Sequence, residues 1–256
     1  MEAGLPTRLS LIATELLKDE KVFISPEALG CYTKIETMLK RADELPQIFH
    51  LYAYKPIPEE DSSPPKYLKP NPKSIRSAVP VDVANMALDV AIERRNLPLV
   101  LGIIDNSFST PAFHRAKLFT KAAFPLGGLA ISPVAGYGIA TWVGSVQNTM
   151  DANTATGITL AAILAYIGVT SSTGIMAIIT ANDHMDRVVW MPGVPLRQRW
   201  LREEERAALD KVAGAWGFKD PYMRGEEEGE DWDNLHEAIG MRAMILDKSD
   251  LMAGMQ

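Results

Sequence analysis

The feature that most constrains this chain is a stretch of about sixty residues that carries almost no charge. Between Lys121 and Asp183 the only charged side chain is that of Asp151. The hydrocarbon core of a bilayer is about 30 Å thick and requires roughly 20 helical residues to cross it. Each half of the stretch is long enough, so we predict membrane spans near Phe124–Val146 and Thr156–Thr180.

The alternative explanation of this stretch is a pair of buried helices inside a large soluble protein. Helices that are apolar on every side are usually membrane spans or the centre of a larger core, and the rest of the chain offers little apolar surface to enclose two of them. Pro133 falls within the first span, where a membrane helix tolerates proline more readily than a soluble helix does. We therefore favour a transmembrane hairpin over residues 122–182, joined by a turn at Asn148–Asn153.

Small residues recur at four-residue steps in both spans, which places them on one stripe of each helix. Such a stripe lets a second helix approach closely, and close packing is a main source of helix association in lipid. The residues predicted to pack are Gly128, Ser132, Gly136, Ala140 and Gly144 in the first span and Gly157, Ala161 and Ala165 in the second. We expect these stripes to hold a tight antiparallel hairpin, or to bind other membrane helices.

Charges on either side of the uncharged stretch predict its orientation. The basic residues that flank it are Arg115, Lys117 and Lys121 before the first span and Arg187, Arg197, Arg199 and Arg202 after the second. Because basic flanks stay on the cytoplasmic or matrix side, both termini should lie there and the turn should lie across the membrane.

Overall composition excludes several classes of protein. The 256 residues are 47% hydrophobic and 23% charged with a formal charge of −6, which argues against disorder and against nucleic-acid binding through bulk positive charge. Cys31 is the single cysteine, so no internal disulfide can form, and the four histidines have no cysteine partners for a structural zinc site.

Residues 1–121 read as short helices joined by brief turns. Leu9, Ile12, Leu16 and Leu17 give the first helix an apolar face, and Ser25 is a plausible cap for the second. The helices are predicted over Pro6–Asp19, Ser25–Arg41, Glu44–Leu51, Val81–Arg95, Leu97–Asn106 and Thr110–Thr120, with a proline-rich loop over residues 54–80. Paired helices of this length resemble units of a helical-repeat solenoid, although an irregular bundle explains the pattern equally well.

Residues 183–256 read as a charged helical tail. Helices are predicted over Arg199–Trp216 and Asn234–Leu246, and Trp190 and Trp200 could lie among lipid headgroups. An acidic run within the tail is either solvated surface or a docking site for a basic partner such as a ribosomal protein. The residues proposed for docking are Glu226, Glu227, Glu228, Glu230 and Asp231. The predicted fold class is therefore all-α: repeat-like hairpins, a transmembrane hairpin and a helical acidic tail.

The sequence offers no arrangement typical of catalysis. No P-loop, HExxH, CxxC or GxSxG motif is present. Asp183, His184 and Asp186 follow the second span and are better explained as a charged helix end than as a metal or proton site. The spans contain no internal ionisable residue of the kind that marks an ion pathway. We therefore expect a protein that is not an enzyme and that uses no cofactor and no metal.

Two segments resemble a group of fungal mitochondrial proteins. They are LYAYKPIPEEDSSPPKYLKPNPKSIRSAVPVDVANMALDVAIERRNLPLVLGIID (residues 51–105) and WGFKDPYMRGEEEGEDWDNL (residues 216–235). In that group a pentatricopeptide-like helical region is followed by a membrane segment and an acidic tail, and its members are linked to the MIOREX assemblies of mitochondrial gene expression. The resemblance implies an inner-membrane protein with both ends in the matrix and with mitochondrial ribosomes or RNA-processing proteins as partners.

Two features of this chain depart from that group. Its helical array is shorter, which leaves RNA binding open. It also begins MEAGLPTRLS and soon reaches Glu15, Asp19 and Glu20, whereas a matrix-targeting segment is basic and poor in acids. We therefore expect either a longer precursor or import directed by the hairpin and its basic flank.

Two functions are consistent with these features. The favoured one is a non-enzymatic scaffold that holds factors of mitochondrial gene expression at the inner membrane. The alternative is an assembly or transport subunit of a membrane complex, which packs through its small-residue hairpin.

Overall fold

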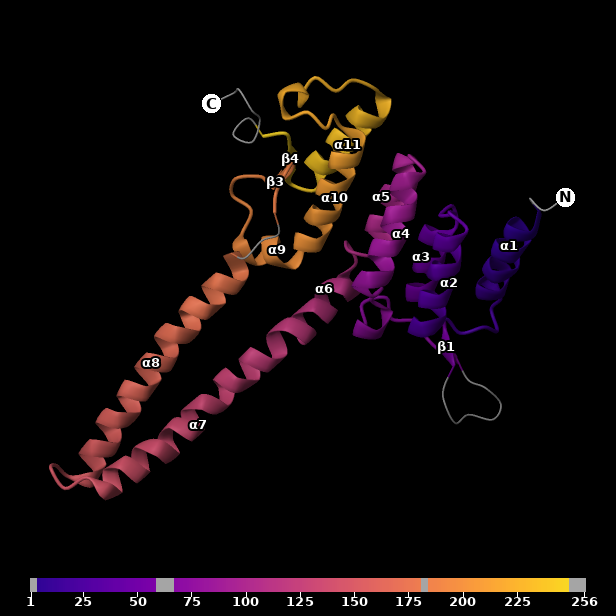
Figure 1. Cartoon of the computed structure of the whole chain (residues 1–256). Coiled ribbons are helices and arrows are strands. Elements are labelled where there is room, and N and C mark those ends of the chain that lie inside the picture. The colour runs from indigo at the N-terminus through magenta and orange to yellow at the C-terminus, as the bar shows by residue number, and fades with distance from the viewer. Residues whose placement is uncertain (1–3, 59–66, 181–183, 249–256) are drawn as a thin grey trace. The chain divides into compact units, whose positions relative to one another are not determined.

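The computed structural model describes residues 4–58, 67–180 and 184–248, and these are mostly helical (Figure 1). The chain divides into two compact units. The first unit combines residues 1–116 with residues 183–256, and the second unit is residues 117–182.

The first unit is built from short helices with two small antiparallel strand pairs. Its elements before the second unit are α1 (Gly4–Lys18), α2 (Pro26–Met38), α3 (Leu45–Tyr54), β1 (Ile57–Pro58), β2 (Tyr67–Leu68), the 3₁₀ turn η1 (Ile75–Ser77), α4 (Val81–Glu93), α5 (Leu97–Asn106) and α6 (Pro111–Lys117). Its elements after the second unit are β3 (Val188–Trp190), α9 (Leu196–Leu201), α10 (Glu203–Trp216), the 3₁₀ turn η3 (Pro221–Met223), α11 (Glu230–Met241) and β4 (Met244–Leu246). The second unit contains a π-helical turn, η2 (Leu118–Ala122), followed by α7 (Ala123–Val146) and α8 (Ala152–Thr180).

Local signals in the sequence explain where several helices begin. The Ser25 side chain accepts a hydrogen bond from the Ala28 backbone N–H at 3.1 Å, and Pro26 occupies the first helical position of α2. Asn96 caps α5 in the same way through the Leu99 N–H at 3.2 Å. The helices predicted in the N-terminal half are therefore confirmed to within a few residues at each end.

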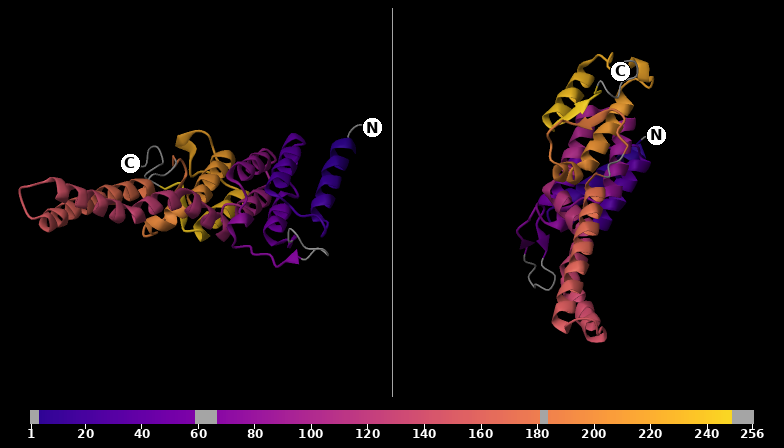
Figure 2. Two further views of the ribbon diagram at one scale, coloured as in Figure 1. Left: turned by 90° about the horizontal axis from the view of Figure 1, so that it is seen from below. Right: turned by 90° about the vertical axis from the view of Figure 1, so that its left-hand side faces the viewer.

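The core of the first unit lies around α4 and α5. Helix α2 packs on α4, α3 packs on α5, and α10 packs on both α4 and α5 (Figures 1 and 2). Leu88 of α4 and Ile103 of α5 are fully buried at this centre. That the helix pairs are repeats of one unit stays a prediction.

Segments from both sides of the uncharged stretch share this core. Leu209 and Val212 of α10 and Ile239 of α11 belong to the same buried cluster as Leu88 and Ile103. Ion pairs also join the two segments: Arg242, which directly follows α11, binds Asp105 of α5 at 2.5 Å, and Lys211 of α10 binds Asp89 of α4. The first unit is thus formed by residues that are far apart in the sequence.

Two expectations for the C-terminal segment are wrong. Residues 244–246, predicted to end a helix, form β4, which pairs with β3 in the register Val188 to Leu246. The helix stops at Met241 because Ala243 adopts a positive φ of 60°, which reverses the chain. Trp190 is not placed for a lipid headgroup layer, because it is buried and its indole N–H donates to Glu203 at 3.0 Å.

Helix α1 buries its polar side. Ser10, Thr14 and Leu17 face the unit, and the Thr14 and Tyr32 hydroxyls lie 2.9 Å apart. Of the four apolar residues that predicted this helix, only Leu17 is buried. The amphipathic pattern correctly gave the helix but did not reveal which face would pack.

Glu36 of α2 lies against this polar side of α1 and is only 3% exposed. Among the described residues, one of its carboxyl oxygens has no hydrogen-bond partner, and burial raises the pKa of Glu36 despite a hydrogen bond from Ser10. The folded state therefore holds the proton more tightly than the unfolded state, so this group lowers stability as pH rises above the ordinary pKa of about 4.5.

We expect Glu36→Gln to stabilise the protein at neutral pH by about 1 kcal/mol, because it removes a buried carboxylate with an unpaired oxygen. The gain should vanish when unfolding is measured below pH 4.5. Glu237→Gln, on the exposed side of α11, is the matched control and should change little at either pH. A gain that persisted in acid would show that Glu36 ionisation is not its source.

Candidate functional site

The second unit consists mainly of two long apolar helices. Helix α7 has 24 residues and α8 has 29, so at 1.5 Å per residue they reach roughly 36 Å and 43 Å, more than the hydrocarbon core requires. Only 6% of the most apolar 18-residue window of the helical stretch Pro111–Val146, which contains α7, is buried within the described part of the chain. For α8 the buried share of the corresponding window is 0%. The two helices are long and apolar enough to cross a membrane, and the described residues do not enclose them as a soluble core would.

Small residues of α7 form the contact between the two helices. Gly136, Ala140 and Gly144 are buried, and Ala140 is 0% exposed. A Cβ atom on Gly144 would lie 2.3 Å from the Thr156 hydroxyl and 2.9 Å from the Ala152 carbonyl oxygen. A Cβ atom on Gly136 would lie 3.1 Å from Cγ2 of Ile163. These glycines therefore allow the close approach of α8.

The other predicted packing residues are not buried at this contact. Gly128 has open space around it, Ser132 is half-buried, and Gly157, Ala161 and Ala165 are exposed. In a helix of 3.6 residues per turn each four-residue step advances by about 40°, so a long stripe winds away from a straight neighbour. Only part of each stripe can face one partner helix, and α8 uses Ala155, Thr156 and Ile163 instead.

Asp151, the single carboxylate of the uncharged stretch, caps α8. Its side chain accepts hydrogen bonds from the backbone N–H groups of Asn153 and Thr154 at 3.1 and 3.3 Å. An acidic group at a helix N-terminus also interacts favourably with the helix dipole. The predicted turn is present and ends earlier than expected, because α8 already begins at Ala152.

A buried ionic network holds the chain just after α8. Arg187 is 1% exposed, and its guanidinium donates to Asp247 at 2.8 and 2.5 Å and to Glu227 at 2.6 Å. The guanidinium also lies 4.7 Å from the ring centroid of Trp232. Arg187 was predicted as a basic membrane flank, but its charge is neutralised inside the first unit.

A second carboxylate fixes the backbone at the same point. Asp210 of α10 accepts hydrogen bonds from the backbone N–H groups of Asp186, Arg187 and Val188 at 3.0, 2.7 and 2.8 Å. The fully buried Arg206 also reaches Asp210 at 3.4 Å. These contacts attach the segment that follows α8 firmly to α10.

The acidic run divides into structural and exposed residues. Although burial alone would raise it, the pKa of Glu227 is lowered by hydrogen bonds from the Phe218 N–H, the Arg187 guanidinium and the Gly225 N–H. Its side chain is 6% exposed, so it cannot dock a partner in this fold. The remaining proposed docking residues are exposed: Glu226, Glu228, Glu230 and Asp231. No local sequence pattern predicted the pairing of Glu227 with Arg187, because the two residues are 40 positions apart in the sequence.

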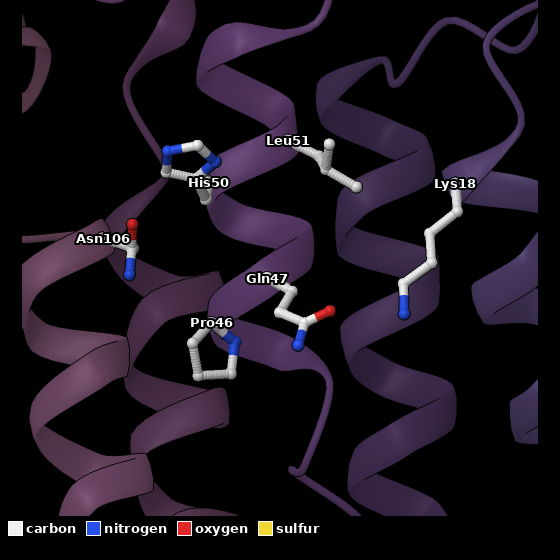
Figure 3. Close-up of a pocket in the computed structure, with 6 residues that line it drawn as sticks. All are labelled: Lys18, Pro46, Gln47, His50, Leu51 and Asn106. Carbon is white, nitrogen blue, oxygen red and sulfur yellow. The ribbon is translucent and has the colours of Figure 1, made fainter.

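Helices α1, α3 and α5 line an open cavity of about 610 Å³ (Figure 3). Three of the polar side chains around it are engaged with neighbours. Lys18 pairs with Glu44 at 2.7 Å, His50 stacks on Tyr54 with ring centroids 4.3 Å apart, and Asn106 donates to the Gly102 carbonyl at 2.8 Å. The groups therefore do not converge on one reacting point, and the absence of enzymatic activity stays a prediction.

Of the three residues after α8 that were considered as a metal or proton site, His184 is exposed and Asp186 has a structural partner. Asp186 forms a two-pronged ion pair with Arg224 at 2.8 and 3.0 Å, while Asp183 lies outside the described residues. Among the residues that the structure describes, no three His, Cys, Asp or Glu side chains are grouped to hold a metal ion.

Comparison with known proteins identifies no relative, because no family model, curated protein or solved structure matches the chain. The resemblance to fungal mitochondrial proteins therefore stays a prediction from the two quoted segments.

Proposed function

We propose that this protein is a membrane-anchored scaffold. In this proposal α7 and α8 cross the bilayer as a hairpin, and the first unit presents a rigid helical surface to partner proteins on one side of the membrane. The exposed apolar surface of the two helices supports the anchor, because side chains of this kind are stable in hydrocarbon and unfavourable in water.

The observation that carries this proposal is the shared core of the first unit. Residues before α7 and residues after α8 pack together, with Arg242 bound to Asp105 and Lys211 bound to Asp89. A folded unit of this kind requires both flanks of the hairpin on the same side of a membrane. This supports an even number of crossings and an orientation in which the Asp151 turn alone is on the far side.

We further propose that the membrane is the mitochondrial inner membrane, that the first unit lies in the matrix, and that its partners belong to the gene-expression machinery. The support for this finer proposal is the resemblance at residues 51–105 and 216–235. The exposed carboxylates Glu226, Glu228, Glu230 and Asp231 suit a basic partner such as a ribosomal protein.

Alkaline carbonate extraction of isolated membranes tests the anchor. We expect the full chain to stay in the pellet with integral proteins, and its release into the supernatant would refute a bilayer-spanning hairpin. A pulldown with and without ribonuclease then tests the partners. Ribosomal proteins that survive ribonuclease would support direct protein contacts, and a pulldown free of them would refute the gene-expression role.

A second function is favoured by one observation, the exposed small-residue face of α8. Because Gly157, Ala161 and Ala165 are exposed, and a Cβ atom on Gly157 would meet nothing within 4 Å, they could pack against a helix of another membrane protein, as in an assembly or transport subunit. Ala161→Leu should then release the chain from a membrane complex on a native gel. A complex of unchanged size would refute this second function.

A further inference from the structure

The outward face of α1 is apolar. Leu5, Leu9, Ile12 and Leu16 are between 48% and 73% exposed and lie along one side of the helix, which we call the α1 stripe. Successive positions differ by four, three and four residues, so the stripe follows the seam of a heptad pattern. Figure 1 shows α1 at the edge of the helices of the first unit, and within the described part of that unit no other helix lies on its outer side.

This arrangement is the reverse of an ordinary surface helix, which buries its apolar side. The buried side of α1 carries Ser10 and Thr14 and meets the Tyr32 hydroxyl, as well as the carboxyl group of Glu36. At 100° per residue, the α1 stripe lies opposite these buried residues. An apolar stripe that the fold directs outward is typical of a surface that another molecule covers.

We propose that the α1 stripe is a self-association surface, on which α1 of a second copy packs antiparallel about a twofold axis. In this arrangement Leu5 lies opposite Leu16 of the second copy, and Leu9 lies opposite Ile12 of the second copy. The spacing thus makes the stripe complementary to itself, as an isologous interface requires.

Charge supports the antiparallel direction. Arg8 and Glu15 flank the stripe on the same side, seven residues apart, and both are exposed. In an antiparallel pair these flanking positions face one another, so Arg8 of each copy meets Glu15 of the other and two ion pairs form. In a parallel pair Arg8 would instead face Ala13, and neither ion pair would form. The opposite flank carries the small, neutral residues Pro6 and Ala13, of which Pro6 is exposed and Ala13 packs against the core of the first unit.

A lipid surface is a less suitable occupant. Helices that lie on anionic membranes are rich in Lys and Arg. Residues 4–21 instead contain three basic side chains (Arg8, Lys18 and Lys21) and three acidic ones (Glu15, Asp19 and Glu20), which sum to a net charge of zero. A single helix pair buries less than the roughly 1,200 Å² of a standard interface, so we expect a dimer with a dissociation constant in the micromolar range.

Charge reversal tests this dimer in the full chain, purified in detergent and measured by analytical ultracentrifugation. Arg8→Glu or Glu15→Arg alone places like charges opposite each other twice, and each should raise the dissociation constant about tenfold. The double variant restores opposite charges and should restore the affinity of the parent. A monomer at 100 µM, on the order of ten times the expected constant, or a double variant as weak as the single ones, would overturn the proposal.

Disulfide trapping tests the register. With Cys31 replaced by Ser, Leu9→Cys and Ile12→Cys chains should cross-link efficiently when mixed and poorly when each is alone. Efficient cross-linking of Leu9→Cys chains with one another would overturn the antiparallel arrangement. A monomeric Ile12→Cys chain whose attached fluorophore is quenched by spin-labelled lipid would identify lipid as the occupant, and would also overturn the proposal.

Discussion

Gly217→Ala should destabilise the first unit by about 3–5 kcal/mol, the loss expected when a buried ion pair is broken. A Cβ atom at Gly217 would lie 1.5 Å from Nη1 of Arg187 and 2.8 Å from Oε1 of Glu227. The guanidinium has no room to move while it stays bound to Asp247 and Glu227. Accommodating one methyl group therefore requires Arg187 to leave its carboxylates unpaired in a buried site.

Gly214→Ala is the matched control for this substitution. Gly214 lies within α10, three residues earlier, and a Cβ atom there meets nothing within 4 Å. Replacing a helical glycine by alanine in open space should stabilise the protein by about 0.5–1 kcal/mol. Chemical unfolding followed by tryptophan fluorescence measures both variants, since Trp190, Trp216 and Trp232 belong to the first unit. Equal effects of the two substitutions would contradict the proposed role of Arg187.

The same network should make stability depend on pH in a defined direction. The pKa of Glu227 is lowered in the folded state, so ionised Glu227 stabilises the fold at any pH above the ordinary glutamate pKa of about 4.5. This stabilisation is lost as the pH falls through the lower pKa that Glu227 has in the folded protein. The deficit of Gly217→Ala should therefore be largest near neutral pH and smaller in acid, where a protonated Glu227 needs no counter-ion.

Gly144→Leu should separate α7 from α8 near their turn. The new side chain would overlap the Thr156 hydroxyl and the Ala152 carbonyl, and overpacking of this kind costs about 1–3 kcal/mol. The packing can be read from a disulfide, because a Cβ atom at position 136 would lie 4.0 Å from the Cβ atom of Ile163, within the range that a disulfide needs. Gly136→Cys with Ile163→Cys, in a chain with Cys31→Ser, should form this bond readily.

We expect Gly144→Leu to slow formation of this disulfide about thirtyfold, the factor that corresponds to about 2 kcal/mol, the middle of the expected free-energy cost. Gly138→Leu is the control, since Gly138 lies on the same helix with nothing within 4 Å of its Cβ position. Cross-linking that is equally fast in both variants would show that Gly144 is not a helix contact.

The sequence predicted those features that local patterns encode. Both long helices were predictable because each is a continuous run of uncharged, largely apolar residues. The start of α2 was predictable from Ser25 because a capping side chain acts within four residues. Part of the packing stripe was also predictable, because Gly136 and Gly144 lie on the correct side of α7.

Features that depend on distant residues were not predictable. Arg187 is 60 residues from Asp247, so neither spacing nor periodicity connects them, and the shared core of the two flanking segments was missed for the same reason. The packing face of α1 was not predictable either, because three of the four apolar residues that indicate the helix are exposed. Its polar residues Ser10 and Thr14 instead found partners on α2.

The most direct test of a membrane hairpin is the side of the membrane on which three cysteines can be labelled in sealed vesicles. The sites are the native Cys31, a Lys219→Cys substitution beyond α8 and a Met150→Cys substitution in the turn, the latter two with Cys31→Ser. All three positions are exposed, and the first two belong to the first unit. We expect a membrane-impermeant maleimide to label positions 31 and 219 from the same side and position 150 only from the other. Labelling of all three from one side, or of positions 31 and 219 from opposite sides, would contradict a hairpin that returns the chain to one folded unit.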